Sequence, residues 1–556
     1  MKNWCNKEYF DITQLDILNF DVDKFNELIQ RHLRFVPGLS LAVVTEAGVY
    51  ATGAGRKSVV DSSEVFPETL FYISSLTKVM TALLVMKLVE SGVLDINESV
   101  YTYVPDFRFR NLNPDDRITL EDLLTHTSGW PDLVPAYYAT SNVSLKEHVY
   151  EELSQVRIVT PPHGIFNYSS ANYNLLGFIC EIVTGLPFSQ LLKQFLDSIG
   201  MSQTHYNYQE AYTLKTMAMG HNAELRSFSL SPHIQDHPGF YPSTQLLSNV
   251  LDLSQIVRLF LGEGQINGQS YLNPVTIQKM MTPKVRVYTN RGDCYGMGLC
   301  LKTRRDPIVL HEGIGLGSFS RMYLIPQRKV GVVLLANSQL YGLTSKITHY
   351  LLDKFPIVSN PMIYRGFSPL DSPSESLEHH QFAPYYFATN GQPVAAQMSK
   401  SDDGWYITLR DLSTGETNEG KLINNEHNGF YTVINALQRK VGFGTRDHNG
   451  LVSSLVIGTI AYTQVDGLCP KVLSEGYKGS YVGFLEDSCQ EMTIHFSVNP
   501  QEELIAALSK DNFKLVPIPY LKHTFASKIG RVEFLAQDGV VYGLRISDVL
   551  RFEKIA

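Results

Sequence analysis

Cysteine is scarce in this sequence of 556 residues, and the few cysteines present are not paired in sequence. None of the six belongs to a C-x-x-C arrangement: Cys5, Cys180, Cys294, Cys300, Cys469 and Cys489. Neither a zinc site nor a disulfide framework is therefore expected. Since disulfides belong mostly to oxidising compartments, this scarcity favours a reducing, cytoplasmic location.

Long apolar runs are absent as well. The stretches Leu83–Met86 and Val330–Ala336 are far shorter than the roughly 20 residues that cross a bilayer. At the N-terminus, Met1–Glu8 carries charge with no apolar run behind it, so no signal peptide is expected. These features predict a protein that does not work in a membrane.

Positive charge is in deficit. The chain has 47 Lys and Arg against 55 Asp and Glu, which gives a formal net charge of −8. Binding to a phosphate backbone needs clustered Lys and Arg, so a nucleic-acid partner is not expected. The negative balance mainly favours solubility.

The first part of the chain mixes strand and helix patterns. Strand patterns at 39–44, 48–52 and 321–336 enclose helical patterns at 77–94 and 172–184. The run 330–335 is apolar throughout, which suits a buried strand. This order predicts an α/β (α+β) layer with a helical insertion.

The second part of the chain is β-rich. A Pro/Ser-rich link at 361–380 is followed by short alternating runs separated by turn residues, as in a lipocalin-like domain or another barrel. Since single cores stop growing beyond roughly 250–300 residues, we divide the chain at this link. The expected units are a first domain at 1–360, the linker, and a β-rich domain at 381–556. Whether that domain is one larger barrel or two small ones is left open.

The strongest chemical pattern lies at the start of the helix expected at 77–94. Ser75 and Lys78 stand at i and i+3 and therefore share a helix face, which is the S-x-x-K spacing of acylating serines. Ser74, at i and i+4 from the lysine, is the rival nucleophile. A lysine has a reference pKa of ~10.4, so burial or a nearby cation must lower it before Lys78 can act as a base. Ordinary helix starts also contain this pattern, so the surrounding sequence must show whether Ser75 and Lys78 form a catalytic pair.

That context resembles a known family. The segment Thr69–Ala82 resembles the nucleophile region of class C β-lactamases and penicillin-binding proteins, whose relatives include esterases and D-aminopeptidases. Leu88–Asp95 is similar to the family too, and Ile118–Gly129 looks like its structural L-L-T-H-T-S-G signature. The resemblance extends over roughly residues 20–355. It implies a β-lactamase/transpeptidase-like fold, in which helices and an all-helical subdomain flank an antiparallel sheet.

The resemblance also assigns the family's Y-x-N element. Tyr168 falls on its tyrosine, which implies that Tyr168 shares a proton with Lys78 and passes it to the leaving group. The asparagine of the motif falls on Ser170, which is a departure from the family. A serine cannot donate an amide N–H, so the usual contact to a substrate amide at Ser170 is in doubt.

The third family element is K-T-G or H-x-G, and His311-Glu312-Gly313 resembles the second form. By resemblance, His311 is a catalytic residue and Gly313 lies on the strand that lines the site. The backbone N–H of Ile314 then joins that of Ser75 as the oxyanion hole, and losing such a donor typically costs ~3 kcal/mol in the transition state.

Competing motifs are missing from the sequence. There is no G-x-S-x-G of the α/β-hydrolases and no H-E-x-x-H of the zinc proteases. The glycines Gly313, Gly315 and Gly317 do not form a G-x-G-x-x-G dinucleotide motif. Neither a metal nor another cofactor is expected.

These motifs together predict a serine hydrolase that acts through an acyl-enzyme on an ester or an amide/peptide substrate, as an esterase, amidase or D-peptidase. The H-x-G form is commoner in such relatives than in true β-lactamases. One alternative is a transacylase or peptide cyclase, in which an amine replaces water. Another is a binding protein that kept the fold and lost catalysis, which the Ser170 departure encourages. The expected partner is a small-molecule or peptide substrate, and the sequence leaves the oligomeric state open.

Overall fold

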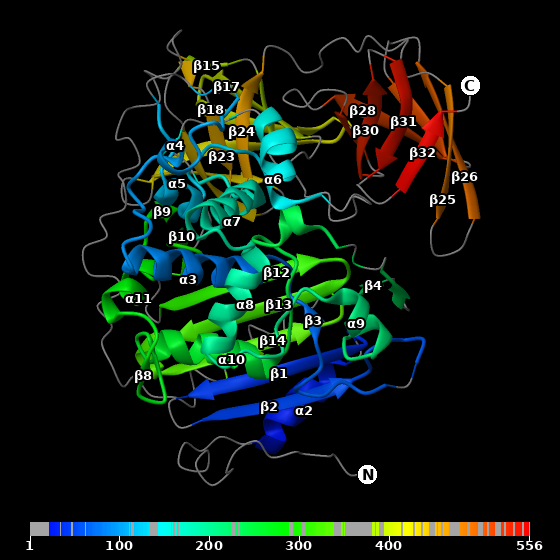
Figure 1. The fold of residues 1–556 in the computed structure, drawn as a ribbon. Coiled ribbons are helices and arrows are strands. Elements are labelled where there is room, and N and C mark those ends of the chain that lie inside the picture. Colours follow the sequence, from blue (N-terminus) through cyan, green and yellow to red (C-terminus); the bar gives the residue numbers. More distant parts are fainter. Residues whose placement is uncertain are drawn as a thin grey trace.

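The protein is described here from a computed structural model (Figure 1). The described residues are 22–338 apart from short gaps, of which 133–142 is the longest, then 346, 347 and 350, and the strands between 381 and 554 with some of their turns. The expected linker at 361–380 lies outside the described residues.

An eight-stranded antiparallel sheet forms the first domain, in the order β2-β1-β14-β13-β12-β11-β10-β9. Its strands are β1 (Gly38–Thr45), β2 (Val49–Gly55), β9 (Val285–Arg286), β10 (Asp293–Tyr295), β11 (Cys300–Lys302), β12 (Ile308–Gly315), β13 (Ser318–Ile325) and β14 (Val330–Ala336). β14 is buried at every position because it lies between β1 and β13 with both of its faces covered. The expected apolar strand and the hairpin that leads into it are confirmed.

Helices cover both faces of this sheet (Figure 1). The helices of the first domain are α2 (Val22–His32), α3 (Thr77–Glu90), α4 (Val100–Tyr103), α5 (Leu120–Thr125), α6 (Leu145–Glu147), α7 (Ser170–Thr184), α8 (Phe188–Ser198), α9 (Tyr208–Thr213), α10 (Val250–Leu261) and α11 (Pro274–Met280), of which α2 lies on one face of the sheet and α3 and α10 on the other. Alternate residues of β14 face opposite cores, since Val332 and Leu334 pack with Ile29 of α2 while Val333 and Leu335 pack with α3 and α10.

Helix α3 packs against α7 and α8, and the turn that leads into it packs against β12, so this helix positions the expected nucleophile. Its residues from Thr77 to Met86 are all buried, so this helix is apolar on every side rather than amphipathic. α7, which packs against α3 and α5, ends at Gly185 in the left-handed conformation (φ 69°). Figure 1 shows the group α4–α7 above α3, which is the all-helical subdomain that the resemblance implied.

The β-rich segment forms two closed eight-stranded barrels. The first contains β16 (Tyr385–Ala388), β17 (Val394–Ser401), β18 (Gly404–Asp411), β19 (Thr417–Asn425), β20 (Gly429–Ile434), β21 (Leu437–Phe443), β23 (Ser454–Ile457) and β24 (Ile460–Val465). The second contains β25 (Gly479–Leu485), β26 (Gln490–Val498), β27 (Leu504–Leu508), β28 (Asp511–Pro517), β29 (Thr524–Ser527), β30 (Gly530–Gln537), β31 (Val540–Ile546) and β32 (Leu550–Lys554). The β-rich segment expected at 381–556 thus contains two barrels, which answers the question that the sequence left open.

Each barrel closes by pairing its first strand with its last. β16 pairs with β24 in one barrel and β25 pairs with β32 in the other. Tyr386, Ile407 and Leu455 are fully buried and lie in the core of the first barrel. Its interior is therefore filled by side chains at these positions.

Within the described residues, no single helix is long and apolar enough to cross a bilayer. Helices α7 and α8 reach that length only as a pair, and they meet at 88°.

Candidate active site

Ser75 lies in a short 3-10 turn, Ser74–Leu76, that leads directly into α3. Ser74 has a φ of 47°, in the left-handed region that costs a residue other than glycine about 1 kcal/mol or more. The side chain of Ser74 is buried, and its Oγ donates to the carbonyl of Ile314 at 3.2 Å. Ser75 is only half-buried. The rival serine, Ser74, is thus hydrogen-bonded to strand β12, while Ser75 faces the site.

Lys78 is completely buried at the start of α3. Its Nζ lies 3.2 Å from Ser75 Oγ, 3.2 Å from Ser170 Oγ and 3.1 Å from the carbonyl oxygen of Ser243. Burial lowers the pKa of this lysine from 10.5 to about 7, against an opposing effect of Asp132. The structure therefore provides a lysine that is partly neutral near pH 7, beside the predicted nucleophile.

Tyr168 completes this group from the segment before α7. Its side chain is close enough to that of Ser75 for the serine to influence the pKa of the phenol, and its ring centroid is 4.9 Å from Lys78 Nζ. Burial raises the pKa of Tyr168 well above 10, so the phenol keeps its proton in the free protein. A protonated phenol in contact with Ser75 can give a proton to a leaving group there.

Strand β12 brings Gly313 and Ile314 against the turn that holds Ser75. A Cβ added at Gly313 would lie 2.1 Å from the carbonyl oxygen of Ile73 and 2.9 Å from the backbone N of Ser75. Only glycine lets the strand approach this closely. Ser320 Oγ, on the facing strand β13, donates to the same Ile73 carbonyl at 2.6 Å. The proximity fits an oxyanion hole, and the roles of Gly313 and Ile314 stay predictions.

His311 lies two residues earlier on β12 and is nearly completely buried. Its Nδ1 is 2.9 Å from the carbonyl oxygen of Glu312, and its Nε2 is 3.1 Å from Tyr295 Oη. Because a carbonyl only accepts, we assign the proton to Nδ1, and Nε2 then accepts from Tyr295. Burial lowers the pKa of His311 to about 3. His311 therefore brings no positive charge to the site, and its predicted catalytic role is untested.

Ser170, the residue in place of the family's asparagine, is buried, and its predicted contact with a substrate stays a prediction. Its Oγ contacts Lys78, and its backbone N donates to Asp132 Oδ1 at 3.0 Å. The position at which this sequence differs from the family's Y-x-N motif thus lies beside Lys78, in the buried part of the site.

Two residues next to Lys78 were not predicted from the sequence. Asp132 follows the L-L-T-H-T-S-G signature by three positions, and burial raises the pKa of its carboxyl group. His126, inside that signature, is fully buried and lies with its ring 4.3 Å from that of Tyr168. Extending the motif past Gly129 to Trp130-Pro131-Asp132 was the available signal for the aspartate.

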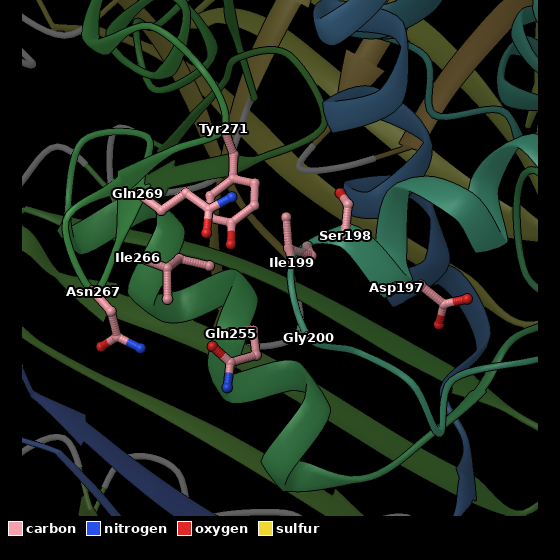
Figure 2. Close-up of a pocket in the computed structure, with 9 residues that line it drawn as sticks. All are labelled: Asp197, Ser198, Ile199, Gly200, Gln255, Ile266, Asn267, Gln269 and Tyr271. Carbon is pink, nitrogen blue, oxygen red and sulfur yellow. The ribbon is translucent and has the colours of Figure 1, made fainter.

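A separate cavity of about 310 Å³ lies between the end of α8, α10 and the hairpin of β7 (Gln265–Ile266) and β8 (Gln269–Ser270). Figure 2 shows the residues around it: Asp197, Ser198, Ile199, Gly200, Gln255, Ile266, Asn267, Gln269 and Tyr271. None of the predicted site residues lines this cavity. Among the residues that the structure describes, no group of three or more His, Cys, Asp or Glu is arranged to hold a metal ion.

Comparison with known proteins identifies the family. The family model described as Beta-lactamase matches residues 25–352. Protein Flp of Staphylococcus aureus (strain NCTC 8325) is 26% identical over 331 residues, which are 58% of this chain and 64% of Flp, so the match spans less than two thirds of that relative.

Two solved structures share the fold. The octameric penicillin-binding protein homologue from Pyrococcus abyssi has a TM-score of 0.54 at 23% identity, over 89% of this chain and all of that one. SurE has a TM-score of 0.60 at 21% identity, over 80% of this chain and 98% of that one. The first domain has the expected β-lactamase/transpeptidase-like fold. On the match across residues 25–352, the chain belongs to the β-lactamase family of serine-hydrolase-like proteins.

Proposed function

We propose that this protein is a serine hydrolase that forms an acyl-enzyme at Ser75 with an ester or an amide/peptide substrate. The observation that carries the proposal is the 3.2 Å contact between Ser75 Oγ and a buried lysine. With its pKa lowered to about 7, Lys78 is neutral often enough at physiological pH to take a proton.

The proposed reaction starts when Lys78 Nζ accepts the proton of Ser75 and Ser75 Oγ bonds to the substrate carbonyl carbon. Backbone N–H groups of Ser75 and Ile314 stabilise the negative oxygen. The bond to the leaving group then breaks as Tyr168 gives that group a proton, and Lys78 returns its extra proton to Tyr168. Water attacks the acyl-enzyme by the same steps, which releases the acid and restores Ser75.

Hydrolysis of p-nitrophenyl butyrate tests this proposal. We expect release of nitrophenol with an initial burst equal to one equivalent of protein, because acylation of Ser75 precedes its slower hydrolysis. Ser75→Ala should abolish both the burst and the turnover, whereas Ser74→Ala keeps them. Equal turnover by wild type and Ser75→Ala would overturn the proposal.

An added amine decides between hydrolysis and acyl transfer. A hydrolase gives the free acid as its main product with or without the amine. If the amide predominates at millimolar amine, the protein is instead the transacylase or peptide cyclase kept as the alternative. Absence of any Ser75-dependent turnover or labelling would favour a binding protein that uses this fold.

We expect β-lactam turnover to be poor. His311 is neutral, and Arg321 on the facing strand is paired with Glu312, so neither offers a free cation to the carboxylate of a β-lactam. A charge-assisted hydrogen bond contributes ~1.5–3 kcal/mol, so kcat/KM for a chromogenic cephalosporin should fall at least about 10-fold below that for p-nitrophenyl butyrate. Comparable values for the two substrates would contradict this account.

A further inference from the structure

A chain of three polar groups leads away from Ser75 into the protein. Lys78 Nζ contacts Ser170 Oγ at 3.2 Å, and the Ser170 side chain is close enough to the carboxylate of Asp132 to lower the pKa of that carboxyl group. The backbone N of Ser170 donates to Asp132 Oδ1 at 3.0 Å. One aspartate therefore accepts from the backbone of the residue that touches the lysine and lies beside its side chain.

The directions of these hydrogen bonds follow from what each group can do. A carboxylate only accepts, so an interaction between the Ser170 hydroxyl and Asp132 requires the single hydroxyl proton to point to the carboxylate. Ser170 Oγ then has only lone pairs for Lys78 and must accept from it. The carbonyl of Ser243, the third neighbour of Lys78 Nζ at 3.1 Å, also only accepts.

A neutral lysine has two N–H groups and one lone pair. With the N–H groups directed at Ser243 and Ser170, the lone pair is left for the remaining neighbour, Ser75 Oγ. This is the orientation that a general base needs to take the serine's proton. It depends on where the hydroxyl proton of Ser170 points.

We propose that Asp132 is a positioning residue: by holding the hydroxyl proton of Ser170, it makes Ser170 an acceptor for Lys78 and directs the lysine lone pair at Ser75. The inference rests on the proposed function, because it assigns Lys78 the part of the base. Ser170 and Asp132 together form the acceptor group beside the lysine. A serine alone can also turn its proton toward Lys78 and so compete with Ser75.

Asp132 also acts on Lys78 through its charge. Its carboxylate favours the protonated lysine and partly offsets the effect of burial. The other titratable groups around Lys78 are Tyr168, Tyr173, His126 and His311; the tyrosines have raised pKa values and the histidines lowered ones, so all four are neutral near pH 7. Removing the negative charge of Asp132 therefore lowers the pKa of Lys78.

The pH profile of kcat/KM for p-nitrophenyl butyrate tests the charge effect. In the wild type, activity should rise as Lys78 loses its proton through pH 7. Asp132→Asn keeps an acceptor oxygen for Ser170 and loses the charge, so we expect this acid limb to move about one pH unit lower. Asp252→Asn is the matched control: Asp252 is a buried carboxyl with a raised pKa that bonds Thr204 and not Lys78, so its replacement should leave the limb in place.

A double-mutant cycle tests the positioning. Asp132→Ala frees the Ser170 hydroxyl and should lower kcat about 100-fold with little change in KM. Measured above the acid limb, where the charge of Asp132 no longer changes the protonation of Lys78, the same replacement in a Ser170→Ala background should change kcat less than about 3-fold, because Asp132 positions Lys78 through that hydroxyl. Near-UV circular dichroism checks that each variant is folded. If Asp132→Ala does not fold, Asp132→Asn decides: it keeps an acceptor for the Ser170 hydroxyl, so its kcat above the acid limb should stay within about 3-fold of the wild type, and a loss of about 100-fold would overturn the positioning role.

Different results would overturn the proposed function and the positioning role of Asp132. If the wild type shows no Ser75-dependent turnover, the proposed function is wrong. If the wild type is active but the effects of Asp132→Ala and Ser170→Ala multiply independently, only the positioning role of Asp132 is overturned. An acid limb that does not move in Asp132→Asn overturns only the effect of its charge on Lys78.

Discussion

Burying the ammonium group of Lys78 costs free energy in the folded protein. The unfolded chain, in which water solvates this group, does not carry that cost. The unfolded lysine has a pKa near 10.5 and the folded one a pKa of about 7, so the unfolded state binds the proton more tightly. Below pH 7 both states are protonated, and the full cost is roughly 5 kcal/mol. The cost shrinks as pH rises from 7 and disappears above 10.5.

We predict that Lys78→Met stabilises the protein while it removes activity. The apolar side chain fills the site without a charge, although Ser243 and Ser170 lose a donor, so the net gain should be about 1–3 kcal/mol at pH 6. Chemical unfolding of both proteins at pH 6 and pH 10 measures it, and the gain should be larger at pH 6. A variant that is less stable than wild type at pH 6 would contradict the buried-charge argument.

Among the individual residues of the site, sequence spacing predicted the pair Ser75 and Lys78 but not the groups that orient it. The choice against Ser74 agrees with its buried, left-handed conformation, a feature that no side-chain pattern reveals. From the sequence, a contact of Ser170 with a substrate amide was in doubt, and the structure places its hydroxyl beside Lys78. Asp132 was missed because it is 38 residues from Ser170 in sequence, and only the fold makes them neighbours.

Strand β12 and the turn before α3 form the site only because they pack closely. Gly313 and Gly315 lie on the same strand but in different surroundings. A Cβ at Gly313 meets backbone atoms of Ile73 and Ser75 at 2.1 and 2.9 Å, whereas at Gly315 the nearest atom is the side-chain oxygen of Ser74 at 3.2 Å. The backbone atoms near Gly313 cannot make room for a methyl group, whereas the Ser74 hydroxyl near Gly315 can rotate away.

We predict that Gly313→Ala separates β12 from the turn and enlarges the oxyanion site. The rate of p-nitrophenyl butyrate hydrolysis should fall at least about 100-fold, while Gly315→Ala changes it less than about 5-fold. Steady-state kinetics of the two variants, with melting temperatures to confirm folding, makes the comparison. Equal activity of the two would show that Gly313 does not set the geometry of the site.

Elements with strong local patterns were predicted well. The apolar run of β14 and the helical periodicity of α3 and α7 correspond to observed elements. The outer strands β9 to β11 were not predicted, since strands of two or three residues have no room for alternation. Their place in the sheet follows from pairing with β12 rather than from local sequence.

For the molecule as a whole, alternation predicted β strands after the linker without deciding how many barrels they form. Closure depends on pairs such as Tyr385 with Val465 and Tyr481 with Lys554, which are far apart in sequence. Local patterns carry no information on such pairs. The choice between one barrel and two was therefore open until the strand pairing was known.

We predict that residues 1–360 fold without the barrels. All eight strands of the large sheet lie between Gly38 and Ala336, and no described strand pair joins that sheet to either barrel. Scanning calorimetry of the 1–360 chain should show a cooperative transition, with Ser75 still reactive. A chain without such a transition would mean that the barrels are integral to the first domain.

The central claim is that Ser75 is the nucleophile and Lys78 its base, and site-specific labelling tests it most directly. The protein is treated with a fluorophosphonate and examined by intact mass spectrometry and peptide mapping, beside Ser75→Ala, Ser74→Ala and Lys78→Met. We predict one adduct on Ser75 in the wild type and in Ser74→Ala, none in Ser75→Ala, and labelling at least about 100-fold slower in Lys78→Met. An adduct in Ser75→Ala, or wild-type labelling rates in Lys78→Met, would contradict the account.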